Sequence, residues 1–232
     1  MTPDLPLLLV PGMMCDARMW GTVPQALQPR DIRHVAPVGE DSMAALAAEA
    51  LRQAPPRFAL AGLSMGGILA MEMLAQAPER VERLALLDTN PRAEVPEVQA
   101  RRGPQMARAR AGSLEDVLRA DMIPNYFASG QDTGPFEALC LEMGLSLGTE
   151  VFIRQSLALR NRADRQEVLA RFQGPALVLM GAEDRLCPRD RHDLMHALLP
   201  QSRLVIIDGA GHLPPLERPQ DTIAALRCWL EE

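Results

Sequence analysis

The chain has 232 residues, 47% of them hydrophobic, which is enough for one α/β domain with a sizeable core or for a domain with an insertion. Its formal net charge of −6 argues against a surface that binds nucleic acid or an anionic membrane. All 24 basic residues are arginine, so Schiff-base chemistry and phosphate-binding loops that need a lysine are excluded.

The apolar runs and the cysteines predict a cytoplasmic protein. Residues 1–4 place no basic segment before the first apolar run, so we expect no signal peptide, and no run reaches the length of a membrane span. We expect the thiols to act as small hydrophobes in a reducing compartment. No metal site is expected, because no cysteine or histidine pair has ligand spacing, and no cofactor is expected. The cysteines are Cys15, Cys140, Cys187 and Cys228.

Strand and helix patterns alternate over the first 90 residues. Asp41 or Ser42 can cap the helix expected at residues 43–53, and Pro55 with Pro56 ends it. Short apolar runs predict strands at residues 5–10, 33–38, 58–63 and 81–87. Further helices are expected up to about residue 27 and from Gly67 through residue 74.

The pattern changes after Pro91. Residues 91 to about 171 show helical periodicity and no strong strand, which predicts an inserted helical segment. Strands then return at residues 176–180 and 204–207, followed by helices at 189–199 and 219–230. Six strands alternating with helices predict a mostly parallel sheet with helices on both faces, built from residues 1–90 and 172–232. Within the insertion, helices are expected at 93–111, 113–122, 136–143, 150–158 and 164–172.

Ser64 lies at the junction between the third predicted strand and the helix that follows it. The surrounding residues, Gly62-Leu63-Ser64-Met65-Gly66, form G-x-S-x-G in the strand–turn–helix context that this motif requires. Gly62 and Gly66 stand where a sharp turn leaves no room for a Cβ atom. The helix N-terminus offers N–H groups and a partial positive charge to an oxyanion beside Ser64. The alternative is a Gly-Ser turn without chemistry.

His212 is the best candidate for the base that a serine nucleophile needs. It follows the last strand in a glycine-rich loop, at the sheet edge where ligands of parallel sheets bind. His34 falls inside a strand. His192 and His196 are four residues apart on one helix, but no third metal ligand is evident, and we interpret this pair as a solvated helix face.

Asp184 is the favoured partner for the second ring nitrogen of that histidine. It follows the fifth strand in Gly181-Ala182-Glu183-Asp184. Asp88, Glu183 and Asp208 are the alternatives, and a role for Asp184 in a turn or helix cap also stays open.

The order Ser…Asp…His with a nucleophile elbow resembles the α/β-hydrolase family over nearly the whole chain. The elbow at Ser64, the acid turn at Asp184 and the histidine loop at His212 each match a motif of that family. The resemblance implies an α/β-hydrolase core, a helical cap formed by residues 91–171, and a small bacterial serine esterase as the type of protein.

The resemblance also implies an oxyanion hole. Members often carry His-Gly after this first strand, whereas the present chain has Pro11 before Gly12. The next residue, Met13, would donate its backbone N–H together with that of Met65. A backbone donor does not depend on its side chain, so the hole can survive without the histidine. Candidates for the substrate pocket are Met14, Trp20, Met122, Tyr126 and Phe127, each of which can equally be part of the core.

The expected reaction is acyl transfer from a small ester or thioester to water. A serine at the elbow disfavours haloalkane dehalogenases and epoxide hydrolases, which resemble this fold but use aspartate there. C–C bond cleavage, cofactor-free perhydrolysis and a non-catalytic ligand-binding protein of the same fold stay open. The oligomeric state cannot be inferred from this sequence. Either an anionic substrate or a solvated helix face would explain the arginines of the insertion, Arg101, Arg102, Arg108 and Arg110.

Overall fold

The computed structural model describes residues 5–232, which contain a six-stranded sheet whose neighbouring strands are all parallel. The expectation about a signal peptide concerns residues 1–4, which lie outside this part of the chain. The strand order is β2-β1-β3-β4-β5-β6, and the predicted α/β class is confirmed. The strands are β1 (Leu7–Val10), β2 (Ile32–His34), β3 (Phe58–Leu63), β4 (Val81–Leu87), β5 (Ala176–Gly181) and β6 (Ser202–Ile207).

Side chains of the strands alternate between two apolar layers. In β1, Leu7 and Leu9 belong to the core on one face of the sheet, and Leu8 and Val10 belong to the core on the other. The inner strands β3 and β5 are buried along their whole length, whereas the edge strands β2 and β6 are partly exposed. The continuous apolar runs in the sequence are therefore strands covered on both faces.

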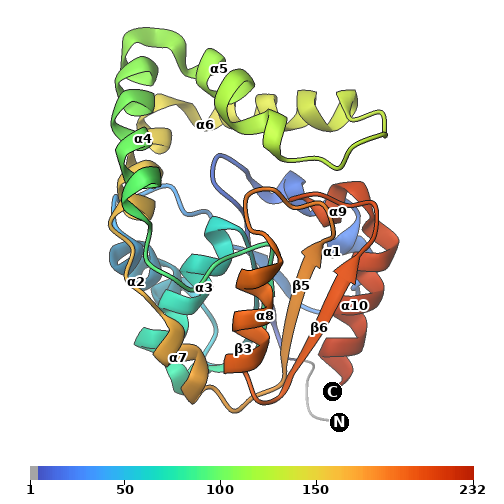
Figure 1. Cartoon of the computed structure of the whole chain (residues 1–232). Coiled ribbons are helices and arrows are strands. Elements are labelled where there is room, and N and C mark those ends of the chain that lie inside the picture. Colours follow the sequence, from blue (N-terminus) through green and yellow to red (C-terminus); the bar gives the residue numbers. More distant parts are fainter. Residues whose placement is uncertain (1–4) are drawn as a thin grey trace.

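Helices cover both faces of this sheet (Figure 1). On one face, α2 (Met43–Gln53) packs against α3 (Met65–Gln76), with α8 (Arg189–Leu198) in the same apolar layer. On the other face, α10 (Pro219–Glu231) lies with α1 (Val23–Ala26). Within residues 5–232, no helix has both the length and the apolar character that crossing a membrane requires.

The segment between β4 and β5 places three helices over the carboxyl ends of the strands (Figure 1). We call α4 (Pro96–Arg108), α5 (Leu114–Val117) and α6 (Gly134–Arg160) the cap helices. Gly148 leaves the helical conformation inside α6 (φ 82°, ψ 175°), so a kink separates two helical stretches there, which contain the helices expected at 136–143 and 150–158.

The next helix, α7 (Gln166–Arg171), packs against α3 and α8 beside the sheet, although the sequence division placed it in the cap. These contacts of one helix do not test where the cap ends, so the cap boundary at residue 171 stays a prediction. β2 ends at His34 and not at residue 38, ahead of Pro37, which has no N–H to donate to a strand neighbour. The remaining short elements are Ala17–Trp20, Pro78–Arg80, Ala109–Ser113, Leu118–Met122, Ile123–Asn125 and α9 (Pro214–Glu217).

Candidate active site

Ser64 occupies a sharp turn between β3 and α3. Its backbone adopts φ 56° and ψ −118°, a conformation that a residue with a side chain rarely adopts and that stores strain. A Cβ atom on Gly62 would overlap the carbonyl group of Gly66, and one on Gly66 would overlap the carbonyl of Val10. The glycines of the motif are therefore required by the close approach of β1, β3 and α3.

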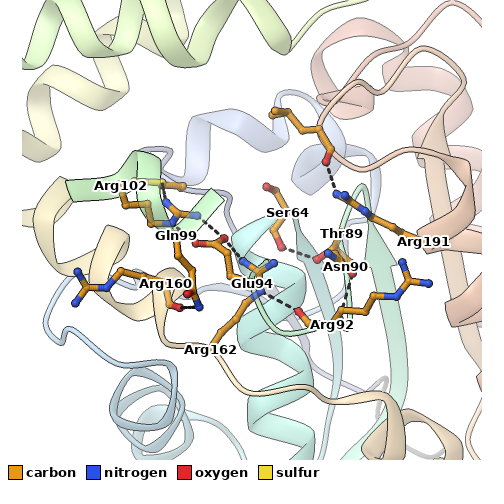
Figure 2. Close-up of polar contacts among 12 residues, drawn as sticks. Ser64, Thr89, Asn90, Arg92, Glu94, Gln99, Arg102, Arg160, Arg162 and Arg191 are labelled. Atoms are coloured by element: carbon orange, nitrogen blue, oxygen red, sulfur yellow. Dashed lines mark hydrogen bonds and ion pairs between the residues drawn. The ribbon is translucent and has the colours of Figure 1, made fainter. Parts of the chain in front are cut away.

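Thr89 holds this turn from the end of the neighbouring strand, a role that the sequence analysis missed. Its hydroxyl donates to the carbonyl oxygen of Ser64 at 2.7 Å (Figure 2). The Ser64 N–H donates to the carbonyl of Leu87 at 2.9 Å. A Cβ on Gly67 would lie 2.6 Å from the Thr89 side chain, so the helix start and Thr89 fit together closely. The available signal was the polar run that ends β4.

His212 and Asp184 form a buried pair at the carboxyl ends of β6 and β5. His212 Nδ1 lies 2.9 Å from Asp184 Oδ2. Asp184 Oδ1 accepts the backbone N–H groups of Leu186 and Cys187 at 2.8 and 3.0 Å. Burial raises the pKa of Asp184, but the His212 ring and these N–H groups outweigh burial and bring the pKa below its ordinary value. Asp184 is therefore a carboxylate at neutral pH, and it leaves His212 Nε2 for another partner.

Two of the alternative acids, Glu183 and Asp208, lie away from His212. Glu183 accepts the backbone N–H and the hydroxyl of Ser129 at 3.0 and 2.7 Å. Asp208 is exposed to solvent. Within residues 5–232, neither of them bonds to His212.

Asp88, the third alternative, is fully buried beside Asp184. Its Oδ1 accepts the N–H of Gly181 at 2.9 Å, while its Oδ2 meets no donor within residues 5–232. Burial raises the pKa of Asp88 well above its ordinary value, and the charge of Asp184 raises it further. The protonated Asp88 lies beside the Asp184 carboxylate without adding a second negative charge. Within residues 5–232, Asp184 and not Asp88 bonds to the His212 ring.

The other three histidines do not line the cavity that contains Ser64. His34 and His196 are exposed, and His196 Nδ1 lies 2.7 Å from the Ser202 hydroxyl. His192 is completely buried, which corrects the expectation that it belongs to a solvated helix face. It lies on the inner face of α8 together with Met195, and burial lowers its pKa to about 4. His192 is therefore neutral at physiological pH.

Two unpaired backbone N–H groups lie next to Ser64. Within residues 5–232, the N–H groups of Met13 and Met65 have no acceptor, whereas the N–H of Met14 donates to Gln155 Oε1 at 2.8 Å. Met65 is the first residue of α3, and Met13 follows Gly12, on which a Cβ would lie 3.5 Å from the Cβ of Ser64. Donors in this position fit an oxyanion hole.

The loop of His212 is clamped by Glu217, a second residue that the sequence analysis missed. The Glu217 carboxylate accepts the N–H groups of Gly211 at 2.9 Å and of Leu213 at 3.2 Å, on either side of the histidine. It also accepts the N–H of Ala128 at 2.8 Å. Ala128 belongs to the stretch that follows the 3₁₀ turn Ile123–Asn125. One buried carboxylate therefore ties the histidine loop to that stretch. The only sequence signal was Pro214-Pro215, which is typical of a helix start.

Ser64, His212, Met13 and Met65 line one cavity of about 470 Å³ between the elbow and the cap helices. The structure thus places the residues predicted as nucleophile, base and N–H donors on the wall of one cavity. Asp184 lies behind His212 and is only 6% exposed.

The five predicted pocket residues divide into two groups. Met122 and Tyr126 line the cavity, and the Tyr126 ring lies 5.9 Å from the His212 ring between centroids. Met14, Trp20 and Phe127 are buried in the apolar core and do not line it. The apolar wall is completed by residues that the sequence analysis did not single out, Ile68, Val95, Val98, Phe152, Leu159 and Leu186.

The model of the alpha/beta hydrolase family matches residues 7–226. The chain belongs to the alpha/beta hydrolase family. A pimeloyl-[acyl-carrier protein] methyl ester esterase of Chromobacterium violaceum is 30% identical over 175 residues, covering 73% of this chain and 68% of the relative. The corresponding esterase of Klebsiella pneumoniae is 25% identical and covers 93% of this chain and 90% of the relative.

Solved structures of similar fold agree with this family assignment. A thermophilic esterase from Thermogutta terrifontis, solved with malate bound, superposes with a TM-score of 0.88 at 29% identity, over 99% of this chain and 90% of the other. The enol-lactonase of Burkholderia xenovorans has a TM-score of 0.87 at 21% identity, over 99% and 92%, and shares the fold. The esterases among these relatives support a carboxylic ester hydrolase.

In this hydrolase, Cys187 lies close to the buried pair. Its Sγ and the ligand atoms of Asp184 and His212 lie within 4.8 Å of one another. Burial raises the pKa of Cys187, so the thiol stays protonated, and both oxygens of Asp184 already accept hydrogen bonds. This donor set does not suit a metal ion, which binds thiolate and not thiol. The expectation of no metal site stays a prediction.

Proposed function

We propose that this hydrolase cleaves a small carboxylic ester through an acyl-enzyme, with Ser64 as nucleophile, His212 as base and Asp184 as the orienting acid. The observation that carries the proposal is the buried His212–Asp184 pair. Within residues 5–232, His212 Nε2 has no hydrogen-bond partner, and the ring lines the same cavity as the strained Ser64. The assignment of Asp184 is supported by its 2.9 Å contact with His212 and by its charge at neutral pH.

The reaction proceeds in two halves that use the same groups. Ser64 Oγ attacks the ester carbonyl while His212 Nε2 takes its proton, and the oxyanion is held by the N–H groups of Met13 and Met65. His212 then protonates the departing alcohol, and a water molecule repeats the sequence on the acyl-enzyme. A general base contributes roughly 10²–10⁴-fold and one oxyanion donor roughly 10²–10³-fold to such a reaction.

The relatives support a small alcohol as the leaving group, because the curated ones are methyl ester esterases. The cavity of about 470 Å³ is consistent with a modest acyl chain. Thioesters and lactones belong in the same test, since their carbonyl groups react by the same steps.

The proposal is tested by measuring kcat/KM for p-nitrophenyl esters of increasing chain length, with methyl esters, lactones and acyl thioesters beside them. Ser64→Ala should lower kcat/KM by at least about 10³-fold, because the covalent step is lost and only binding and the oxyanion donors remain. Its circular dichroism spectrum should equal that of the wild type.

Ser113→Ala serves as the matched control, because Ser113 lies in the cap region and does not line the cavity. It should hydrolyse every ester at the wild-type rate. If Ser64→Ala retained more than a few per cent of the activity, the serine mechanism would be wrong. If the folded wild type cleaved none of these substrates, the non-catalytic ligand-binding alternative would replace it.

A further inference from the structure

The cavity wall carries an excess of positive charge, although the chain as a whole carries −6. Among residues 5–232, only two carboxylates line it, Glu94 and Asp121. Of the cations, Arg92 pairs with Asp190 outside the cavity, and Arg191 donates to a backbone carbonyl. The arginines that line the cavity are Arg92, Arg101, Arg102, Arg162, Arg185 and Arg191. An anion that enters this cavity therefore meets a surface of opposite charge.

Two of these arginines share one buried carboxylate (Figure 2). Arg102 donates to Glu94 through Nε and Nη2, the latter at 2.8 Å, and Arg162 donates to the same carboxylate through Nη1. The side chains of Glu94, Arg102 and Arg162 are 3%, 12% and 9% exposed. We call these three residues the arginine pair with its bridging glutamate. Two cations and one anion leave this group with a net charge of +1 in a largely desolvated place.

Within residues 5–232, one Nη nitrogen of each arginine in this group has no oxygen as hydrogen-bond acceptor. Arg162 Nε donates to the Arg92 carbonyl at 3.0 Å, but Arg162 Nη2 has no acceptor within residues 5–232. In the described part of the chain, the only acceptor of Arg102 Nη1 is the thioether sulfur of Met13 at 3.9 Å, which is a weak acceptor. Guanidinium groups in this state bind carboxylates strongly, because the bonds are charge-assisted and geometrically matched.

The position of the group relative to Ser64 limits the length of the ligand. Arg102 contacts the side chain of Met13, and the backbone of Met13 carries the proposed oxyanion donor. Figure 2 shows the arginine pair with its bridging glutamate on one side of Ser64. A negative group that reaches Arg102 while its ester carbonyl lies at Ser64 must be separated from that carbonyl by only a few carbon atoms.

We infer that the preferred substrate is a monoester of a short dicarboxylic acid, whose free carboxylate binds Arg102 and Arg162 while Ser64 attacks the ester. The inference rests on the proposed function and names its substrate class. The net charge of +1 matches one carboxylate, whereas a phosphate monoester carries close to −2 at neutral pH. Glu94 tunes this preference, because it competes with the substrate for the same donors.

The test compares the monomethyl and dimethyl esters of succinate, glutarate and adipate, with methanol release as the readout. Each pair has the same acyl chain and differs in one negative charge. The wild type should prefer the monomethyl ester of at least one acid by about tenfold or more in kcat/KM, the effect of one charge-assisted bond. Equal rates for all three pairs would overturn the inference.

Three variants separate recognition from structural effects. Arg102→Gln should lower kcat/KM for the monomethyl ester at least about tenfold more than kcat/KM for the dimethyl ester. Glu94→Gln should raise the preference, because it removes the competing carboxylate. Arg110→Gln is the matched control: Arg110 is exposed in the same region, does not line the cavity, and should leave the preference unchanged.

The opposite signs expected for Arg102→Gln and Glu94→Gln are the decisive feature. A purely structural ion pair would make both variants lose activity on both esters together, and that result would overturn the inference. It would leave the proposed function intact as long as the dimethyl ester is cleaved by the wild type and not by Ser64→Ala. If Ser64→Ala still cleaved the dimethyl ester, the proposed function itself would fail.

Discussion

At the scale of single residues, the site depends on carboxyl groups whose charge is set by what surrounds them. Asp184 is held as a carboxylate by His212 and by two backbone N–H groups, while Asp88 beside it is held neutral by burial. Two adjacent aspartates thus have pKa values moved in opposite directions. The difference follows from the surroundings, because Asp184 is bonded to the imidazole and Asp88 is buried without a cationic partner within residues 5–232.

Asp88→Asn tests whether Asp88 is protonated in the folded protein. The folded pKa of Asp88 lies above its unfolded value near 3.9, so its contribution to stability is complete below that value and is lost as pH rises toward the folded pKa. An asparagine keeps the acceptor for Gly181 and does not titrate. The difference in the free energy of unfolding between Asp88→Asn and the wild type should therefore move in favour of the variant as pH rises from 5 to 8.

The measurement is Tm against pH, where each kcal/mol corresponds to about 2–4 °C in a protein of this size. Asp208→Asn, at an exposed aspartate, should follow the wild-type curve at every pH. Parallel curves for Asp88→Asn and the wild type would show that Asp88 is ionised in the folded state.

The residues that sequence reasoning found and those it missed differ in a physical way. Ser64 and His212 stand in glycine-rich turns after strands, where local spacing identifies them. Thr89 and Glu217 act by hydrogen bonds to backbone groups that are distant in the chain or lie in another loop, as when Glu217 reaches Ala128. No local pattern encodes such a contact, so the sequence could not predict these supports.

At the scale of elements, the core was predictable and the cap only in outline. β3, β4 and α2 have the predicted bounds, because buried apolar runs end at polar turns and Ser42 caps α2 by accepting the Ala45 N–H at 3.2 Å. The cap helices pack on one another and on the loops of the core, so helical periodicity gave their number only approximately. Gly112, which has a φ of 94°, interrupts the helical conformation in the segment Ala109–Ser113 between α4 and α5.

Glu217→Gln tests whether α9 fixes the histidine loop. The amide would turn donors toward the N–H groups of Gly211 and Ala128 and would remove the charge. We expect a loss of about 1.5–3 kcal/mol in the free energy of unfolding, the scale of a hydrogen bond to a charged group. kcat should fall while KM changes little, because the base is displaced and the cavity is not.

Urea unfolding, ester kinetics and hydrogen exchange check this expectation. Amides of residues 126–128 and 209–213 should exchange faster in the variant. Glu183→Gln, at a partly exposed carboxylate of the neighbouring loop, should change stability by no more than about 0.5 kcal/mol. Wild-type kcat together with wild-type protection in Glu217→Gln would refute the positioning role.

At the scale of the whole molecule, the fold brings together residues that are far apart in the sequence. The parallel sheet places the carboxyl ends of β3, β5 and β6 at one edge, and these ends carry Ser64, Asp184 and His212. The cap helices close the space above them, and α4 supplies Arg101 and Arg102 to the cavity wall. Fold class and site edge were therefore predictable from the sequence, whereas the shape and charge of the cavity depended on how the cap packs.

Activation of Ser64 by His212 can be measured by reacting the folded protein with a fluorophosphonate and mapping the labelled peptide by mass spectrometry. We expect one label per chain, on Ser64, and labelling slowed by at least about 10²-fold in His212→Ala. Labelling at another residue, or at the wild-type rate in His212→Ala, would contradict it.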